Sequence, residues 1–175
     1  IIHKFKGVAE LSYEDFHRIF GVNFYGTVHM VKEFLPHLLK RSQAQILNVS
    51  SMGGYVPVPG QTVYGASKAA IKLLTEGLRS ELMESKVGVT VAFPGAVATN
   101  ITTNSGLEIP EGGADSAKFK SLPAPTAAKI MVDAIEKGKP RVTVGKDATM
   151  LDRISRINPV FAANMIYKKM KSLLQ

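Results

Sequence analysis

Tyr64 and Lys68 are the two residues of this 175-residue chain whose types and spacing point most directly to chemistry. They stand four positions apart, so on a helix both side chains lie on one face, one turn apart. A phenol normally ionises near pH ~10, which is too high for acid–base work at neutral pH. An ammonium group one turn away favours the phenolate and lowers that pKa. The pair therefore predicts proton transfer at a substrate oxygen.

Ser51 lies upstream, where the sequence predicts the end of a strand. It follows the apolar run from Ile46 to Val49 and precedes Gly53 and Gly54, so the chain should open into a loop there. A hydroxyl at that point can hold a substrate oxygen beside the tyrosine. Tyrosine, lysine and serine together suit proton transfer to a carbonyl or alcohol oxygen.

The rest of the chain predicts helices and strands in alternation. Ser12, with Asp15 three residues later, indicates the start of a helix that runs to about Lys40, with Pro36 loosening its last turns. Short strands rich in β-branched residues are expected at 45–49, 88–93 and 141–144. Further helices are expected at 63–85, at 126–137 with Thr126 as its cap, and at 147–174 with a break near 158–159.

These motifs, in this order, resemble the catalytic half of the short-chain dehydrogenase/reductase family. Ser51 stands thirteen residues before Tyr64, Asn23 lies in the first long helix, and Pro94-Gly95-Ala96-Val97-Ala98-Thr99 follows a strand. The resemblance runs from about Ile1 to about Val144. It implies an α/β fold with a doubly wound, Rossmann-like parallel sheet.

The resemblance also implies hydride transfer between NAD or NADP and a secondary alcohol or ketone. Tyr64 would exchange the proton, Lys68 would lower its pKa and bind the ribose, and Ser51 would orient the carbonyl. Asn23 would hold a water in a proton relay that includes the lysine. The residues that would line the nicotinamide follow the strand at 88–93: Pro94, Gly95, Val97 and Thr99.

A long irregular stretch, 100–125, matches the family's substrate lid in position. Residues Val56 and Val58, together with apolar residues of that stretch, predict a partly hydrophobic substrate pocket. Two histidines and a carboxylate, His29, Glu33 and His37, lie four apart, but Pro36 disturbs their geometry and we predict no metal site there.

A pyrophosphate-binding glycine turn does not follow any N-terminal strand in this sequence, and the family's Asn-Asn-Ala-Gly segment is also absent. By the resemblance, Ile1 would come almost directly after that segment. We therefore expect a fragment or a truncated product, with a partial catalytic region at 1–145 and a basic amphipathic helical extension at 146–175. Since the region that normally selects the nucleotide is missing, the sequence leaves NAD and NADP both open.

Two functions consequently remain open: the catalytic portion of an oxidoreductase, and a truncated, catalytically inactive relative that acts through helix-mediated dimerisation. The helices at 13–40 and 63–85 carry small or apolar faces and are expected to make a homo-oligomer, as in the family's four-helix bundle. The small-molecule partner would be the substrate, an alcohol or a ketone.

The net charge of +8 is partly concentrated at the C-terminus, where basic and apolar residues alternate. This pattern is typical of a helix on a membrane surface, so peripheral membrane contact is one expectation, whereas we predict no nucleic-acid partner. Cysteine is absent, which excludes disulfides and thiolate metal sites. The start of the chain has no signal-peptide pattern, and we expect a cytoplasmic location.

Overall fold

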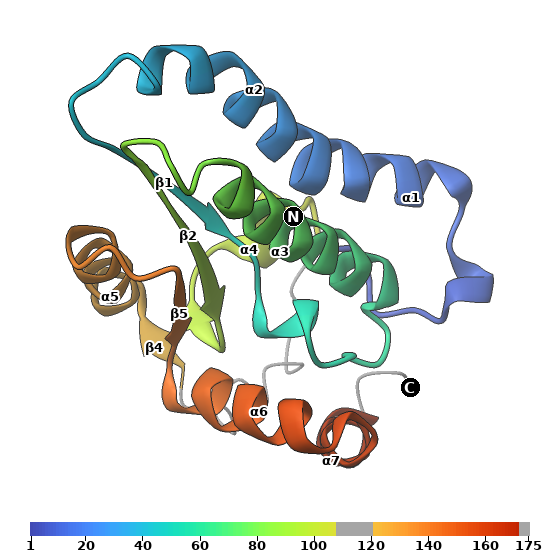
Figure 1. Cartoon of the computed structure of the whole chain (residues 1–175). Coiled ribbons are helices and arrows are strands. Elements are labelled where there is room, and N and C mark those ends of the chain that lie inside the picture. Colours follow the sequence, from blue (N-terminus) through green and yellow to red (C-terminus); the bar gives the residue numbers. More distant parts are fainter. Residues whose placement is uncertain (108–120, 172–175) are drawn as a thin grey trace.

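Three parallel strands form the centre of the structure, a computed structural model that describes residues 1–107 and 121–171 (Figure 1). They are β1 (Ala44–Val49), β2 (Val87–Pro94) and β5 (Arg141–Val144), in the spatial order β1-β2-β5. The register pairs Val49 with Ala92 and Pro94 with Val144, so the carboxyl ends of the strands meet along one edge. The predicted α/β class and the three predicted strands are confirmed.

The central strand β2 is buried because both faces of the sheet are covered. Its residues Val89, Val91 and Phe93 are almost inaccessible to solvent, as expected for a parallel strand with near-continuous apolar sequence. Helix α3 (Thr62–Glu81) packs on one face of the sheet and α5 (Ala124–Glu136) on the other (Figure 1). This sandwich fixes the strand ends from which the site is built.

The first helical segment has three parts rather than one. After the 3₁₀ turn η1 (Val8–Glu10) come α1 (Tyr13–Phe20), the π-helical turn η2 (Gly21–Tyr25) and α2 (Gly26–Leu38). The predicted cap is confirmed, since the Ser12 hydroxyl accepts a hydrogen bond from the Asp15 amide at 3.1 Å and the Asp15 carboxylate accepts one from the Ser12 amide. Pro36 is tolerated in the last turn of α2, which ends two residues later.

Helix α3 ends at Glu81, four residues before the predicted end. Ser85 explains the difference, because its hydroxyl donates to the Leu82 carbonyl at 2.8 Å and accepts from the Val87 amide at 3.1 Å. These local bonds replace helical ones and turn the chain into β2.

The prediction that Thr126 caps the next helix is wrong. Helix α5 begins at Ala124, with Pro125 in its first turn, where the fixed φ of proline suits a helix and its missing N–H is not needed. Before it, β3 (Val97–Ala98) and β4 (Leu122–Pro123) form a small parallel pair, and α4 (Ile101–Asn104) lies between them in sequence. Half of the predicted lid, 108–120, lies outside the described residues.

Two helices close the chain, α6 (Lys146–Ile157) and α7 (Pro159–Met170), and the predicted break between them is confirmed. The Asn158 side chain caps α7 by accepting from the Phe161 amide at 2.9 Å. Val56 is buried in a core cluster with Leu151, Ala162 and Ile166, and it also lines a pocket together with Val58. In the part of the chain that the structure describes, no helix is both long enough and apolar enough to cross a membrane.

Candidate active site

A cavity of about 150 Å³ lies beside the carboxyl ends of β1 and β2, and Ser51, Tyr64 and Gly95 all line it. Ser51 follows β1 and Gly95 follows β2, and parallel strands bring such ends to one edge of a sheet. The expected proximity of Ser51 and Gly95 is therefore confirmed. The rest of the lining is mostly apolar and includes Ile2, Phe5, Met52, Val58 and Met170.

The Ser51 hydroxyl and the Tyr64 ring approach each other across Gly53. Ser51 caps the 3₁₀ turn η3 (Met52–Gly54) by accepting from the Gly53 amide at 3.1 Å. A Cβ at Gly53 would lie 3.4 Å from Tyr64 Cε1 and 3.5 Å from Ser51 Oγ. A Cβ at Gly65 would lie only 2.9 Å from the Gly53 carbonyl oxygen, so glycine there lets α3 come close to η3. Small residues thus place the phenol beside the serine.

Lys68 lies on the same side of α3 as Tyr64, as their spacing predicts. Its Nζ is 5.8 Å from the centroid of the Tyr64 ring and donates to the Val49 carbonyl at 3.1 Å. Burial disfavours the ammonium form and lowers the pKa of Lys68 to about 8. The amine is therefore held at the end of β1, close to the phenol.

The pKa of Tyr64 moves in the direction opposite to the one expected from the lysine. Burial of the phenol raises this pKa above the ordinary value of 10.0, and the hydrogen bond with Ser51 lowers it only in part. Desolvation wins because the phenol is largely covered, whereas the ammonium group of Lys68 is directed at the Val49 carbonyl. In the described structure Tyr64 is consequently a protonated phenol, able to donate a proton.

Asn23 lies in the π-helical turn η2 and is buried, so it occupies the helix irregularity that the resemblance implies. Its Nδ2 donates to Ser67 Oγ at 3.1 Å and to the Ile1 carbonyl at 2.9 Å, while its Oδ1 accepts from the Ile1 amino group at 2.8 Å. Ser67 stands directly before Lys68 in α3. Asn23 thereby joins the first helical segment to α3, the helix that carries Tyr64 and Lys68, and its relay water stays a prediction.

Asp147, which no sequence motif singles out, contacts the loop that follows β2, next to the cavity-lining Gly95. Its Oδ2 accepts a hydrogen bond from the Ala96 amide at 2.7 Å, although 51 positions separate the two residues. A Cβ at Gly95 would lie 2.3 Å from the same oxygen, so only glycine leaves room for the carboxylate. This contact cannot be predicted from local residue spacing, because it forms only where the end of β2 and the start of α6 meet in the folded protein.

The four residues predicted to line the nicotinamide are not all at the cavity. Pro94 ends β2 and Gly95 lines the cavity, whereas Val97 lies in β3 and pairs with Leu122. Thr99 is exposed in the segment after β3. Of the four, only Gly95 is among the residues that line the cavity. Among the described residues, no group of three His, Asp or Glu side chains is placed to hold a metal ion.

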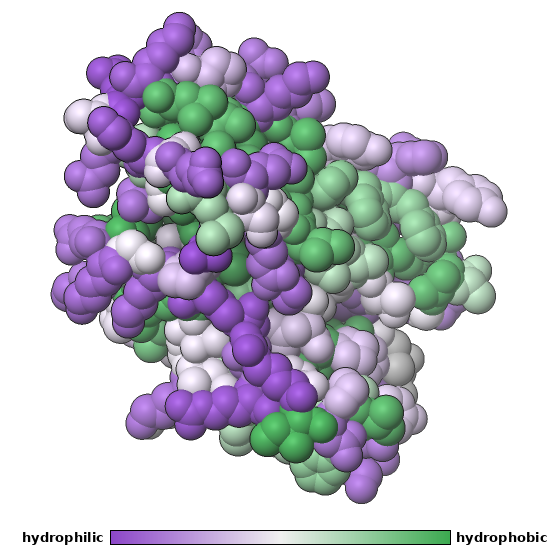
Figure 2. All heavy atoms as spheres, in the orientation of Figure 1, coloured by the Kyte–Doolittle hydropathy of each residue, from purple (hydrophilic) through white to green (hydrophobic). Residues whose placement is uncertain are grey.

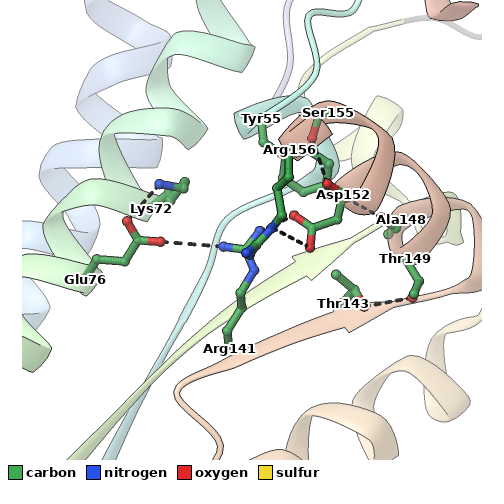
Figure 3. Close-up of polar contacts among 10 residues, drawn as sticks. All are labelled: Tyr55, Lys72, Glu76, Arg141, Thr143, Ala148, Thr149, Asp152, Ser155 and Arg156. Carbon is green, nitrogen blue, oxygen red and sulfur yellow. Dashed lines mark hydrogen bonds and ion pairs between the residues drawn. The ribbon is translucent and has the colours of Figure 1, made fainter. Parts of the chain in front are cut away.

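A second polar cluster fixes α6 on the sheet (Figure 3). The Arg141 guanidinium lies 4.0 Å from the centroid of Phe93, forms an ion pair with Asp152 on α6, and is 3.5 Å from Glu76 on α3. The Tyr55 hydroxyl, just after η3, donates to the Ala148 carbonyl at 2.7 Å. These contacts hold the first turn of α6, and with it Asp147, against the carboxyl ends of the strands.

Comparison with known proteins gives one family. A family profile described as short chain dehydrogenase matches residues 2–109. The chain is 36% identical over 157 residues to the putative oxidoreductase SadH of Mycobacterium tuberculosis, covering 86% of this chain and 57% of that protein. The chain thus spans little more than half of SadH. Over 87 residues it is 44% identical to mouse estradiol 17-beta-dehydrogenase 2, which covers 50% of this chain and 23% of that protein.

Solved structures with a similar fold include dehydrogenases and reductases that bind a nicotinamide cofactor. A short chain dehydrogenase from Burkholderia cenocepacia in complex with NADP superposes with a TM-score of 0.77 at 25% identity, over 97% of this chain and 66% of that one. The 3-ketoacyl-(acyl-carrier-protein) reductase from Brucella melitensis complexed with NADH has a TM-score of 0.70 at 26% identity, over 82% of this chain and 61% of that one.

Proposed function

We propose, from the finding that this chain belongs to the short-chain dehydrogenase/reductase family, that it supplies the proton-transfer part of an oxidoreductase. The reaction would be reversible hydride transfer between NAD or NADP and a secondary alcohol or ketone. The observation that carries the proposal is the convergence of Ser51, Tyr64 and Gly95 on one cavity, with Lys68 one turn from the tyrosine.

The residues around the cavity fit a nicotinamide cofactor. Gly95 lines the cavity at the carboxyl end of β2, the usual ligand position in an open α/β sheet. Lys68 carries an amine whose Nζ is directed to the end of β1, where a ribose hydroxyl can be bound. We propose that Pro94, Gly95, Val97 and Thr99 contact the nicotinamide end, together with Asn23, Tyr64 and Lys68 on the ribose side. When bound, the cofactor supplies or accepts the hydride.

The chain's own residues would handle the substrate oxygen. In the reducing direction the Ser51 hydroxyl donates a hydrogen bond to the carbonyl oxygen and so holds it beside the phenol. Tyr64 then gives its proton to that oxygen as negative charge develops there. The raised pKa keeps Tyr64 protonated at neutral pH, and the nearby Lys68 ammonium stabilises the phenolate that the transfer leaves. The apolar wall with Phe5 and Val58 favours a ketone with hydrophobic substituents.

The test is an assay of the intact protein with NADH and with NADPH against a panel of apolar and polar ketones. We expect ketone-dependent oxidation of at least one nucleotide, and loss of most of that rate in Ser51→Ala but not in Ser80→Ala, whose hydroxyl lies on the exposed side of α3. A folded protein that binds either nucleotide yet reduces no ketone would contradict the proposal.

Self-association through the first helices and α3 is a second candidate property. Large apolar side chains are exposed there: Val22, Tyr25, Met30, Phe34 and Leu73, and Figure 2 shows hydrophobic side chains gathered over α1 and α3. Such faces suit a helical homo-oligomer interface, with or without catalysis. Leu73→Glu should then lower the mass measured by analytical ultracentrifugation, and an unchanged mass would argue against this interface.

A further inference from the structure

We propose that the corner between α6 and α7 docks the protein on an anionic lipid bilayer. Three large apolar side chains, which we call the α6–α7 tip, are exposed at this corner: Ile157 at 86%, Val160 at 69% and Phe161 at 57%. Ile157 is the last residue of α6, and Val160 and Phe161 lie in the first turn of α7, so the three exposed apolar side chains flank the same corner. Figure 2 shows hydrophobic side chains beside hydrophilic ones along the lower edge of the molecule, where these helices lie.

Cations flank the α6–α7 tip on both helices. Arg153 is exposed one turn before Ile157, and Lys168 and Lys171 are exposed on later turns of the α7 face that begins with Val160 and Phe161. From residue 153 to residue 175 the sequence holds five Lys or Arg and no Asp or Glu. A helix with basic residues around exposed apolar ones is the pattern that lies in the interface of an anionic membrane.

The opposite face of α6 and α7 packs against the rest of the protein. Leu151, Ala162 and Ile166 are buried against Val56, and Met170 lines the candidate active-site cavity. The α6–α7 tip therefore belongs to a helix pair whose other face is packed against the rest of the protein. Helix α7 contacts both the cavity and, by this proposal, the membrane.

The positive charge around the α6–α7 tip favours an anionic bilayer, and not a second copy of this chain, as the binding partner. Two such corners would bring the exposed cations Arg153, Lys168 and Lys171 of one copy against those of the other, which is unfavourable at the short distances of a dimer contact. Phosphate headgroups complement the cations, and the acyl region just below them accommodates the apolar side chains. Nucleic acid would complement the cations but leave the three apolar side chains without a partner.

Flotation of the intact protein with phosphatidylcholine vesicles, with and without phosphatidylglycerol, tests the proposal. We expect binding to the anionic vesicles that weakens with salt. The triple variant Ile157→Ser/Val160→Ser/Phe161→Ser should lower the partition coefficient at least about tenfold, since each buried apolar side chain contributes to insertion. Arg153→Gln/Lys168→Gln/Lys171→Gln should do the same.

Matched controls separate the tip from general surface properties. Met83→Ser with Val132→Ser removes exposed apolar side chains elsewhere, and Lys40→Gln/Arg41→Gln/Lys86→Gln removes three exposed positive charges elsewhere. Both should bind vesicles as the unmodified protein does. Absence of binding to anionic vesicles, or equal binding by the tip variant, would overturn the proposal. Equal loss in the charge control would also overturn it, because net charge alone would then explain the binding.

Discussion

Asn23 donates a hydrogen bond through its side-chain amide to the hydroxyl of Ser67, 3.1 Å away, inside the protein. This bond joins the π-helical turn η2 to α3, the helix that carries Tyr64 and Lys68. The irregular turn is thus part of what positions the two candidate catalytic side chains.

Replacing Asn23 by alanine should therefore destabilise the fold. The change removes three hydrogen bonds of a buried side chain and leaves polar groups unsatisfied, so we expect the free energy of unfolding to fall by about 1–3 kcal/mol. Urea denaturation measures it. Asn164→Ala, at an exposed position of α7, is the control and should change stability by less than about 0.5 kcal/mol. An equally small effect of Asn23→Ala would show that the link is dispensable.

Gly95 and Asp147 should be energetically coupled. A Cβ at residue 95 would displace the Asp147 carboxylate and break its bond with the Ala96 amide. Gly95→Ala should thus cost about 1.5–3 kcal/mol, the value of a hydrogen bond to a charged group, and clearly less in an Asp147→Ala background. Gly77→Ala, where a Cβ meets nothing within 4 Å, is the control and should show no coupling to Asp147. Additive costs for Gly95→Ala and Asp147→Ala would refute the contact.

The Lys68 amine should titrate near pH 8 in the absence of cofactor, because burial lowers its pKa. Competitive acetylation across a range of pH, followed by peptide mass spectrometry, gives the midpoint for this one lysine. An unperturbed lysine has its midpoint near pH ~10.4. A midpoint for Lys68 at that ordinary value would mean that the amine is not desolvated at the end of β1.

Tyr55→Phe should change stability in two ways. The loss of the bond to the Ala148 carbonyl should cost about 1 kcal/mol at neutral pH. Burial also raises the pKa of Tyr55, so above pH ~10 the unfolded chain loses this proton while the folded chain keeps it, and stability falls as pH rises. The variant lacks that titration, so its unfolding free energy should decline less steeply above pH ~10.

Tyr167→Phe is the control for this experiment, because Tyr167 is exposed at 53% and lies outside the cluster around Arg141 and Tyr55 (Figure 3). Chemical denaturation at several pH values compares the variants. If Tyr55→Phe and the unmodified protein show the same alkaline decline and the same stability at neutral pH, the Tyr55 hydroxyl is not held as the structure has it.

The sequence predicted the elements whose signals are local. The strand pattern, the Ser12 cap, the break at Asn158 and the shared face of Tyr64 and Lys68 all follow from neighbouring residues. The predicted start of α5 is wrong because Pro125 suits the first turn of a helix, so that α5 begins before Thr126.

Long-range contacts explain the rest of the difference. The bond between Ala96 and Asp147, the burial of Val56 under α6 and α7, and the raised pKa of Tyr64 depend on how distant segments meet. Burial in particular is a property of the whole fold, so the spacing of Tyr64 and Lys68 could predict their proximity but not the net shift of the phenol's pKa.

The most direct test of the account is the turnover of Tyr64→Phe in the intact protein, measured beside its affinity for the nicotinamide cofactor. The phenyl ring keeps the packing against Gly53 but has no proton to give. We expect turnover to fall by about 10²–10⁴-fold, the usual contribution of a general acid, with cofactor affinity largely kept. Turnover within a few-fold of the unmodified protein would contradict the assignment of Tyr64 as the proton donor.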